Sequence, residues 1–178
     1  MDDGRNIILI GYRACGKTTI GKQIADELWK KFVDVDDETC KRFDGKTIAQ
    51  IWQEFGERAW REQEVAVTRE LMGRKNLVIG LGGGTLMEPE ARQAVEEAPN
   101  AVRIYLRCHP DELHRRISED KKSAATRPNL TKHAGSIDEI KEMLALREPV
   151  YEAVANEVFD VTHVTPDNAL RHVIKRCL

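Results

Sequence analysis

Long hydrophobic runs are missing from this sequence, and so is an excess of charge of either sign. The first apolar run, residues 7–10, is short and follows an acidic start, so we expect neither a signal peptide nor a membrane-spanning helix. The 28 lysine and arginine residues nearly balance 30 aspartate and glutamate residues, and the formal net charge is −2. This balance argues against a general nucleic-acid binder and against binding to anionic membranes.

Cysteine patterns that would bind a metal or form a disulfide framework are missing as well. The four cysteines (Cys15, Cys40, Cys108 and Cys177) include no C-x-x-C pair and no cysteine–histidine cluster. We therefore expect reduced thiols in a cytoplasmic protein. Internal repeats and low-complexity segments are absent too, and a length of 178 residues fits a single domain, residues 1–178.

One segment that is present carries the strongest functional signal. It follows the apolar run 7–10 and reads Gly11-Tyr12-Arg13-Ala14-Cys15-Gly16-Lys17-Thr18. This is the G-x-x-x-x-G-K-[ST] phosphate loop, placed as required between a strand and a helix. Backbone N–H groups at the helix N-terminus surround phosphates, the lysine reaches the terminal phosphates and the threonine hydroxyl ligates Mg²⁺. Ala14 stands where many such loops have glycine, and we interpret it as a tolerated variant although alanine is disfavoured at positive φ.

Strand-length apolar runs alternate with helical patterns along the chain. We expect strands at residues 7–10, 32–35, 77–81, 101–106 and 158–161. Helices are expected at residues 18–30, 47–54, 57–73, 88–97, 111–118 and 137–156, and from residue 166 onward. This alternation predicts right-handed β-α-β units, and hence a three-layer α/β/α fold in which helices cover both faces of a five-stranded parallel sheet. Ligands of such sheets bind at the carboxyl ends of the strands.

Two further segments follow predicted strands at that edge. Asp34 and Asp36 follow the second strand, where strand alternation predicts that both carboxylates lie on the same side of the chain. They suit a metal-organising role and a hydroxyl-orienting role, and an acidic turn that caps a helix from Glu38 is the alternative. The triplet 82–84 follows the third strand, and its glycines allow a backbone to approach a ligand closely, unless they form a plain flexible turn.

A polar segment with little periodicity, residues 118–128, ends in Arg127 and a proline. We expect a mobile lid at about residues 117–130 that closes over bound phosphates. By composition alone the same segment is an ordinary surface loop.

Taken in order, these motifs resemble shikimate kinase, a small P-loop kinase of aromatic amino-acid biosynthesis. The resemblance runs from Gly11 to Pro166. Besides the segments above it includes residues 56–64, which match the family's G-E-x-x-F-R-x-x-E with Trp60 at the aromatic position. It also includes residues 127–130, similar to the family's lid end, and residues 146–151, similar to its R-x-P-x-Y segment.

The resemblance implies phosphorylation of the 3-hydroxyl of shikimate to shikimate 3-phosphate, a step of chorismate and aromatic amino-acid biosynthesis. ATP would be the co-substrate, and one Mg²⁺ ion would be bound in the site. The expected partners are these small molecules and neither nucleic acid nor a membrane, and we expect a monomer.

On the acceptor side, at about residues 34–62, the resemblance implies that Arg61 and Arg147 hold the carboxylate of shikimate, for which a guanidinium offers bidentate contacts. It implies that Asp36 binds ring hydroxyls and accepts the proton of the attacking one. The implied substrate-binding residues are Asp36, Arg61, Gly82, Gly83, Gly84 and Arg147.

On the donor side, the resemblance implies that Thr18 binds the metal directly and that Asp34 holds a metal-bound water. Lys17 and Arg127 would neutralise charge on the transferring phosphoryl group, so the catalytic residues would be Lys17, Asp36 and Arg127. The implied nucleotide-binding residues are Ala14, Cys15, Gly16, Lys17, Thr18, Thr19, Arg116, Arg127 and Pro166. Val164 stands where some relatives have an arginine, so that position offers no cation to stack on the base.

Two arginines and two tryptophans on the acceptor side also have a plainer, structural interpretation. Arg61 and Arg147 can be ordinary helix-surface ion-pair partners of Glu64 or Glu148. The two tryptophans that would wall the ring pocket, Trp52 and Trp60, are equally well explained by core packing.

Two other functions compete with the one implied. The first is another small P-loop kinase, of gluconate or of a nucleoside monophosphate; gluconate also offers a carboxylate and hydroxyls. The second is a catalytically silent nucleotide-binding module that regulates a partner. The presence of Lys17, Thr18, Asp34, Asp36 and Arg127 together argues against loss of catalysis.

Overall fold

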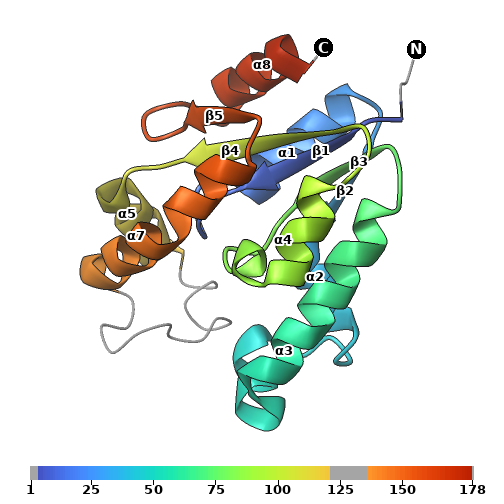
Figure 1. Cartoon of the computed structure of the whole chain (residues 1–178). Helices are drawn as coiled ribbons and strands as arrows, with labels where there is room; N and C mark the ends of the chain where they lie inside the picture. Colours follow the sequence, from blue (N-terminus) through green and yellow to red (C-terminus); the bar gives the residue numbers. More distant parts are fainter. Residues whose placement is uncertain (1–3, 121–135, 178) are drawn as a thin grey trace.

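The computed structural model of the protein describes residues 4–120 and 136–177, and within these ranges the chain forms a five-stranded parallel sheet (Figure 1). The strands are β1 (Asn6–Ile10), β2 (Lys31–Asp34), β3 (Leu77–Gly80), β4 (Ala101–Arg107) and β5 (Glu157–Asp160). Their order in the sheet is β2-β3-β1-β4-β5, and every neighbouring pair is parallel. The α/β fold expected from the sequence is confirmed.

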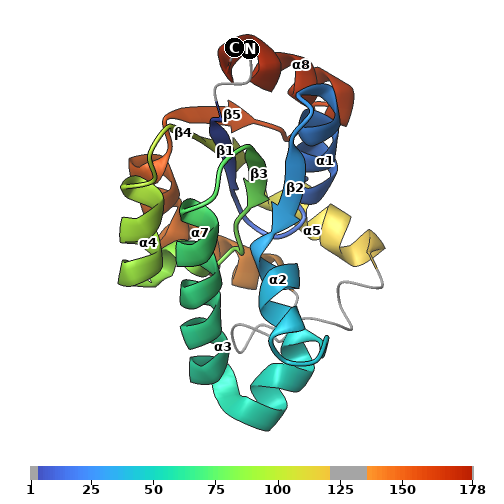
Figure 2. The same cartoon turned by 90° about the vertical axis from the view of Figure 1, so that its right-hand side faces the viewer.

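Helices cover both faces of this sheet (Figures 1 and 2). They are α1 (Lys17–Glu27), α2 (Val35–Lys41), α3 (Ile48–Met72), α4 (Pro89–Glu96), α5 (Pro110–Glu119), α7 (Ile137–Val154) and α8 (Pro166–Cys177), with a short 3-10 helix at Thr85–Met87. One core cluster joins α1, α5 and α8 to the sheet, and a second joins α3 and α4 to it, while α7 contributes to both. No helix in the described ranges is long and apolar enough to cross a membrane.

The central strand β1 illustrates why apolar runs in the sequence predicted the positions of strands. All five of its residues are buried, because helices pack against both of its faces. Asn6 is the one polar member, and it is hydrogen-bonded: its side chain donates to the Arg74 carbonyl and accepts from the Leu77 N–H. Each strand begins and ends within one residue of its expected position.

The strand alternation expected for Asp34 and Asp36 is wrong, and the helix-capping alternative is nearer to the structure. Strand β2 ends at Asp34, and α2 begins at once, so Asp36 lies in the first turn of a helix. Asp34 is the N-cap residue of α2, and its carboxylate accepts a hydrogen bond from the Asp36 backbone N–H at 3.0 Å. The pairing of the two aspartates therefore comes from helix capping and not from strand alternation.

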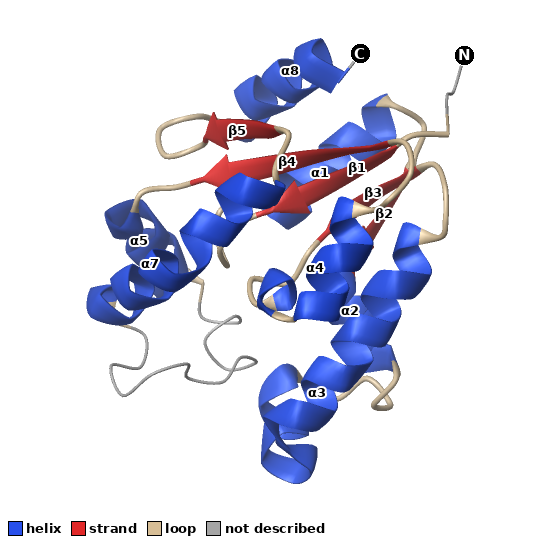
Figure 3. Cartoon of the chain, viewed as in Figure 1, coloured by secondary structure: helices blue, strands red, loops and turns tan. Residues whose placement is uncertain are grey.

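The expected pair of helices at residues 47–54 and 57–73 forms one element, α3, with a kink (Figure 3). Gly56 interrupts it with φ 85° and ψ 161°, a conformation that is essentially restricted to glycine. The kink matters for the site, because residues from both arms of α3 line the same cleft.

Candidate active site

Two adjoining clefts open at the carboxyl edge of the sheet. We call the first the loop cleft; it is lined by Ala14, Gly16, Lys17, Thr18, Thr19, Asp34, Leu81, Arg116 and Asp120. We call the second the tryptophan cleft; it is lined by Tyr12, Ile48, Trp52, Trp60, Arg61, Glu64, Gly84 and Arg147. Arg13, Asp36 and Gly83 line both clefts and so mark their junction.

The loop cleft is built around the segment between β1 and α1. Gly16 is the N-cap residue of α1, so the helix N-terminus opens onto this cleft, where unpaired N–H groups favour anions. Lys17 lies across the loop, and its Nζ donates to the carbonyl oxygens of Gly11 at 2.7 Å and Tyr12 at 2.9 Å. Ala14 has φ 65°, so the loop keeps its left-handed turn although alanine replaces glycine there.

Thr18 connects this loop to the second strand. Its hydroxyl donates to the Asp34 carboxylate, with Oγ1 and Oδ2 3.3 Å apart. A hydroxyl and a carboxylate are thus held together beside the phosphate loop, and oxygen ligands of this kind suit Mg²⁺. Within residues 4–120 and 136–177 no group of three or more His, Cys, Asp or Glu side chains could hold a metal by itself.

The tryptophan cleft contains a buried polar network on α3. Arg61 donates to the Glu64 carboxylate at 2.8 Å, and the same carboxylate accepts from the Thr85 hydroxyl at 2.6 Å. Glu64 is almost fully buried, while the Arg61 guanidinium lies over the Trp52 ring, 5.8 Å from the ring centre. Burial works against the charge on Arg61, but the Glu64 carboxylate raises its pKa, so the guanidinium stays charged. The ion pair with Glu64 predicted as the plainer interpretation does exist, yet it lies in the wall of the cleft.

The glycine triplet lies against this network, and space explains two of its glycines. A Cβ on Gly82 would come within 2.4 Å of the Asp36 carboxylate and 2.7 Å of the Glu64 carboxylate. A Cβ on Gly84 would come within 2.6 Å of the Arg61 guanidinium. Any side chain there would displace the charged groups of the cleft, so the triplet is not merely a flexible turn.

Helix α7 supplies the opposite wall. Arg147 is only 8% exposed, and its guanidinium lies over the Tyr12 ring, 5.8 Å from the ring centre. No carboxylate pairs with Arg147 within the described residues, so the expected partner Glu148 is not its partner; Glu148 instead accepts from the Tyr105 hydroxyl at 2.9 Å. Four residues further along α7, the buried Tyr151 donates a hydrogen bond to the Gly83 carbonyl and fixes the middle of the glycine triplet.

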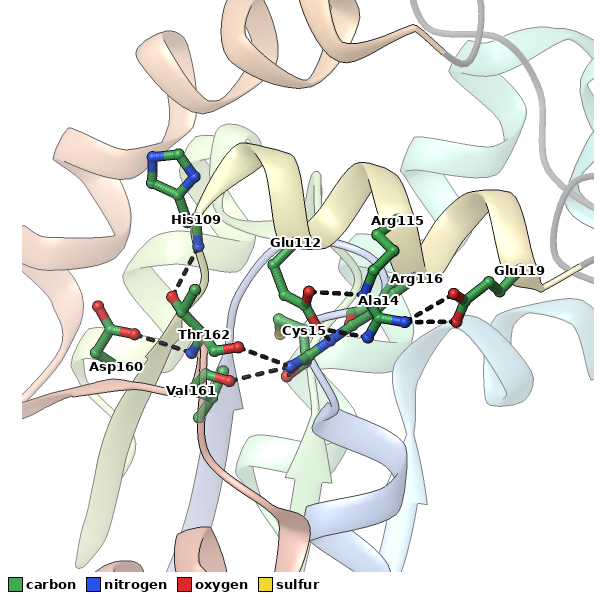
Figure 4. A network of polar contacts seen from close by, with 10 residues as sticks. All are labelled: Ala14, Cys15, His109, Glu112, Arg115, Arg116, Glu119, Asp160, Val161 and Thr162. Atoms are coloured by element: carbon green, nitrogen blue, oxygen red, sulfur yellow. Dashed lines mark hydrogen bonds and ion pairs between the residues drawn. The ribbon is translucent and has the colours of Figure 1, made fainter.

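A third cleft borders the loop on its other side, between α5 and the segment after β5. Figure 4 shows Arg116 of α5 reaching across it. Its guanidinium donates to the Val161 carbonyl at 3.0 Å and to the carbonyls of Ala14 and Cys15, each at 3.4 Å. The Glu112 carboxylate accepts a hydrogen bond from the Arg116 Nε at 2.7 Å. Hydrogen bonds from Arg115 and Arg116 lower the pKa of Glu112 to about 2.

The structure therefore brings together most of the residues that the sequence singled out. Ala14, Cys15, Gly16, Thr19 and Arg116 line the third cleft, together with Val164 and Pro166. Arg127 and the predicted lid beyond residue 120 lie outside the described residues, so their roles stay predictions.

Sequence reasoning gave no role to Arg13 or to Glu139. The carboxylate of Glu139 is fully buried and lies 3.7 Å from the Arg13 guanidinium. The position of Arg13 within a phosphate loop could have indicated a role from the sequence alone. Its partner Glu139 could not be identified in this way, because it lies 126 positions further along the chain, in α7.

Comparison with known proteins agrees with this geometry. Residues 13–178 match the model of the family described as Shikimate kinase. The chain is 36% identical over 171 residues to a shikimate kinase of Pelotomaculum thermopropionicum, covering 96% of this chain and 94% of that protein. Its structure is similar, with a TM-score of 0.86 and 27% identity, to a shikimate kinase from Acinetobacter baumannii in complex with shikimate, covering 98% of this chain and 93% of that one.

A likeness to a rival kinase class is weaker. A gluconokinase from Sinorhizobium meliloti superimposes with a TM-score of 0.61 at 17% identity, covering 99% of this chain and 93% of that one. At that identity the likeness shows a common fold alone.

Proposed function

The chain belongs to the shikimate kinase family, and on that premise we propose that it transfers the γ-phosphoryl group of ATP to the 3-hydroxyl of shikimate at the junction of the two clefts. Phosphorylation of shikimate with ATP, in aromatic amino-acid biosynthesis, is the activity of the family. The 3-hydroxyl and the residue roles below are our proposals.

The observation that carries the choice of acceptor is Arg147. Arg147 is 8% exposed, and a guanidinium with no carboxylate partner in the described part of the chain is costly to bury. A ligand carboxylate would supply the missing charge and accept bidentate hydrogen bonds. Arg61 lies in α3, on the other wall of the tryptophan cleft, and its guanidinium is already paired with Glu64 and Glu57. It would therefore add a second, weaker contact to the ligand carboxylate.

Asp36 at the junction would orient the attacking hydroxyl. Its place in the first turn of α2 brings the carboxylate beside Gly82 and into both clefts. The acceptor oxygen would form a bond to the γ-phosphorus while the bond from that phosphorus to the bridging oxygen of ADP breaks. The hydroxyl proton would pass to an oxygen of Asp36, and the backbone of Gly83, fixed by Tyr151, would help to hold the ring.

On the donor side, Lys17 and the N-terminus of α1 would bind the phosphates in the loop cleft. Thr18 and Asp34 would hold Mg²⁺, which neutralises phosphate charge when it is bound. Arg116 and Pro166 would border the nucleotide base in the third cleft. Arg127 would supply a further cation, as the resemblance implies.

We also propose that the enzyme is a cytoplasmic monomer with only small-molecule partners. In support of small-molecule partners, the net charge of −2 offers no attraction to nucleic acid or anionic lipid. Light scattering after size-exclusion chromatography, with and without shikimate, tests the monomer.

An acceptor screen coupled to ADP release tests the function itself. Shikimate, its methyl ester, gluconate and nucleoside monophosphates are offered with ATP and Mg²⁺. We expect turnover with shikimate and a much higher KM for the uncharged ester, because the ester cannot satisfy Arg147. Turnover with gluconate or a nucleotide but not with shikimate would contradict the proposal, and no turnover with any acceptor would favour the silent binding module.

A further inference from the structure

The junction of the two clefts contains a cation that the proposed reaction has not used. Of the three residues that line both clefts, Asp36 is an acid, Gly83 has no side chain, and Arg13 carries a guanidinium. If donor phosphates lie in the loop cleft and the acceptor lies in the tryptophan cleft, the phosphoryl group must cross between these three residues. Arg13 is therefore placed where phosphate oxygens pass.

The contacts of Arg13 leave part of its hydrogen-bonding capacity unused. Its side chain is 12% exposed, and one terminal nitrogen lies 3.7 Å from the Glu139 carboxylate, longer than a hydrogen bond. Its Nε is buried and has no acceptor within the described residues. Arginine is suited to such a place, since its planar fork matches phosphate oxygens in pairs.

Glu139 positions this arginine without saturating it. It lies in the first turn of α7, where Ser136 caps the helix by accepting from the Glu139 N–H. The carboxylate is fully buried, so it is fixed by the packing of α7 and is a stable anchor for the guanidinium. Helix α7, which also carries Arg147, thus positions Arg13 of the phosphate loop through Glu139.

The two ends of the acceptor need different cations. Arg61 and Arg147 already face the tryptophan cleft, which is enough for one carboxylate. We propose, resting on the proposed function, that Arg13 is a further catalytic residue: its guanidinium binds the phosphoryl group in transit and the phosphate of the product, and Glu139 is its positioning residue.

Binding measurements separate this role from the others, because shikimate and shikimate 3-phosphate share the carboxylate and differ only in the phosphate. Both ligands are titrated calorimetrically into wild type and Arg13→Met, with Mg²⁺ and ADP present. We expect the Kd of shikimate 3-phosphate to rise about tenfold or more, as loss of a charge-assisted contact predicts, and the Kd of shikimate to change less than about threefold. Arg13→Lys keeps the charge but loses the fork and should fall between.

Arg58→Met is the matched control. Arg58 is an exposed arginine of α3, paired with Glu62, so its replacement changes the net charge equally and should alter neither Kd. An equal rise for both ligands in Arg13→Met, or no rise for either, would overturn the proposal.

The variant pair Arg13→Met with Glu139→Gln addresses folding, since Arg13→Met alone leaves a buried carboxylate without this cation. The paired variant should keep the weakened binding of shikimate 3-phosphate. Recovery of wild-type affinity would show that the loss came from Glu139, and would overturn a direct contact. If wild type binds neither ligand, the proposed function fails and this inference fails with it; if wild type binds both, only the Arg13 variants decide.

Discussion

Replacing Arg147 with methionine is expected to weaken shikimate binding without destabilising the ligand-free protein. Arg147 is 8% exposed, and its guanidinium lacks a carboxylate partner within the described residues. Its guanidinium lies over the Tyr12 ring, and a cation–π contact contributes about 1–2 kcal/mol when desolvated. Burying an unpaired charge costs several kcal/mol, so methionine, which fills most of the same space, should leave the free energy of unfolding unchanged or raise it.

Arg61→Met should have the opposite effect on stability. Arg61 donates to Glu64 at 2.8 Å, and the Glu64 side chain is 1% exposed. Without the guanidinium, that carboxylate keeps the hydroxyl of Thr85 but loses its ion pair. Removing one partner of a buried pair typically costs about 3–5 kcal/mol, and the partial exposure of Arg61 places our expectation near about 3 kcal/mol.

Both substitutions should raise the KM for shikimate far more than the KM for ATP. Loss of a partly desolvated contact to the ligand carboxylate is worth about 2–4 kcal/mol, which corresponds to a rise of about 30-fold to about 1,000-fold. The rise should be larger for Arg147, whose charge is not shared with another carboxylate in the described part of the chain.

Urea denaturation of the ligand-free variants and steady-state kinetics at saturating ATP provide the two measurements. Arg147→Lys serves as a control that keeps the charge and should lose less affinity than the methionine variant. The reasoning is refuted if Arg147→Met loses as much stability as Arg61→Met while its KM for shikimate stays near the wild-type value. Arg147 would then be a structural residue, and the missing carboxylate would not mark a ligand site.

Four other substitutions, one of them with a matched control, test the remaining groups. Lys17→Ala should abolish most turnover, because Lys17 supplies charge in the loop cleft, whereas Lys22→Ala on the exposed side of α1 should not; near-normal turnover by Lys17→Ala would remove it from the mechanism. Asp34→Asn keeps a good helix cap and should shift the Mg²⁺ dependence to higher concentration, while Asp36→Asn should lower kcat, and a swap of the two effects would reverse these roles. Tyr151→Phe removes one buried hydrogen bond and should cost about 1–2 kcal/mol of stability and raise the KM for shikimate several-fold; an unchanged KM would mean that the Gly83 carbonyl needs no such support.

Strands β1 and β3 could be predicted closely because they lie in the interior of a parallel sheet. Strands buried on both faces are continuous apolar runs, and those two runs end just before Gly11 and Gly82 of the site. Helix α2 was not predicted from residue 35, because its seven residues are too few and too acidic to show an apolar periodicity. Its start depends on the Asp34 cap, which in the sequence looked like the end of a strand.

Contacts between distant segments could not be predicted. Arg116 was expected at the nucleotide, but its hydrogen bonds to the Ala14 and Val161 carbonyls depend on how α5 packs beside the phosphate loop. The contrast between Arg61 and Arg147 has the same origin. Both follow a helical pattern with an acid nearby in sequence, yet only Arg61 is paired with that acid, because α7 turns Glu148 toward Tyr105.

Gly56 is a position where sequence and structure agree and a single substitution can test the consequence. Its φ of 85° and ψ of 161° divide α3, and a Cβ there would meet no atom within 4 Å. Gly56→Ala would therefore add backbone strain and no steric clash, at a cost of about 1–3 kcal/mol. Gly73→Ala is the matched control, because Gly73 caps the same helix at φ −78°, where alanine is unstrained.

The effect of Gly56→Ala should extend to the tryptophan cleft. Trp52 lies before the kink and Trp60 and Arg61 lie after it, so a straighter helix would pull the two arms of the cleft apart. We expect Gly56→Ala to lower the denaturation midpoint and raise the KM for shikimate while the KM for ATP stays near wild type, since the loop cleft takes no residue from α3. Equal stability and equal KM values for the Gly56 and Gly73 variants would show that packing against the rest of the cleft, and not the glycine backbone, sets the kink.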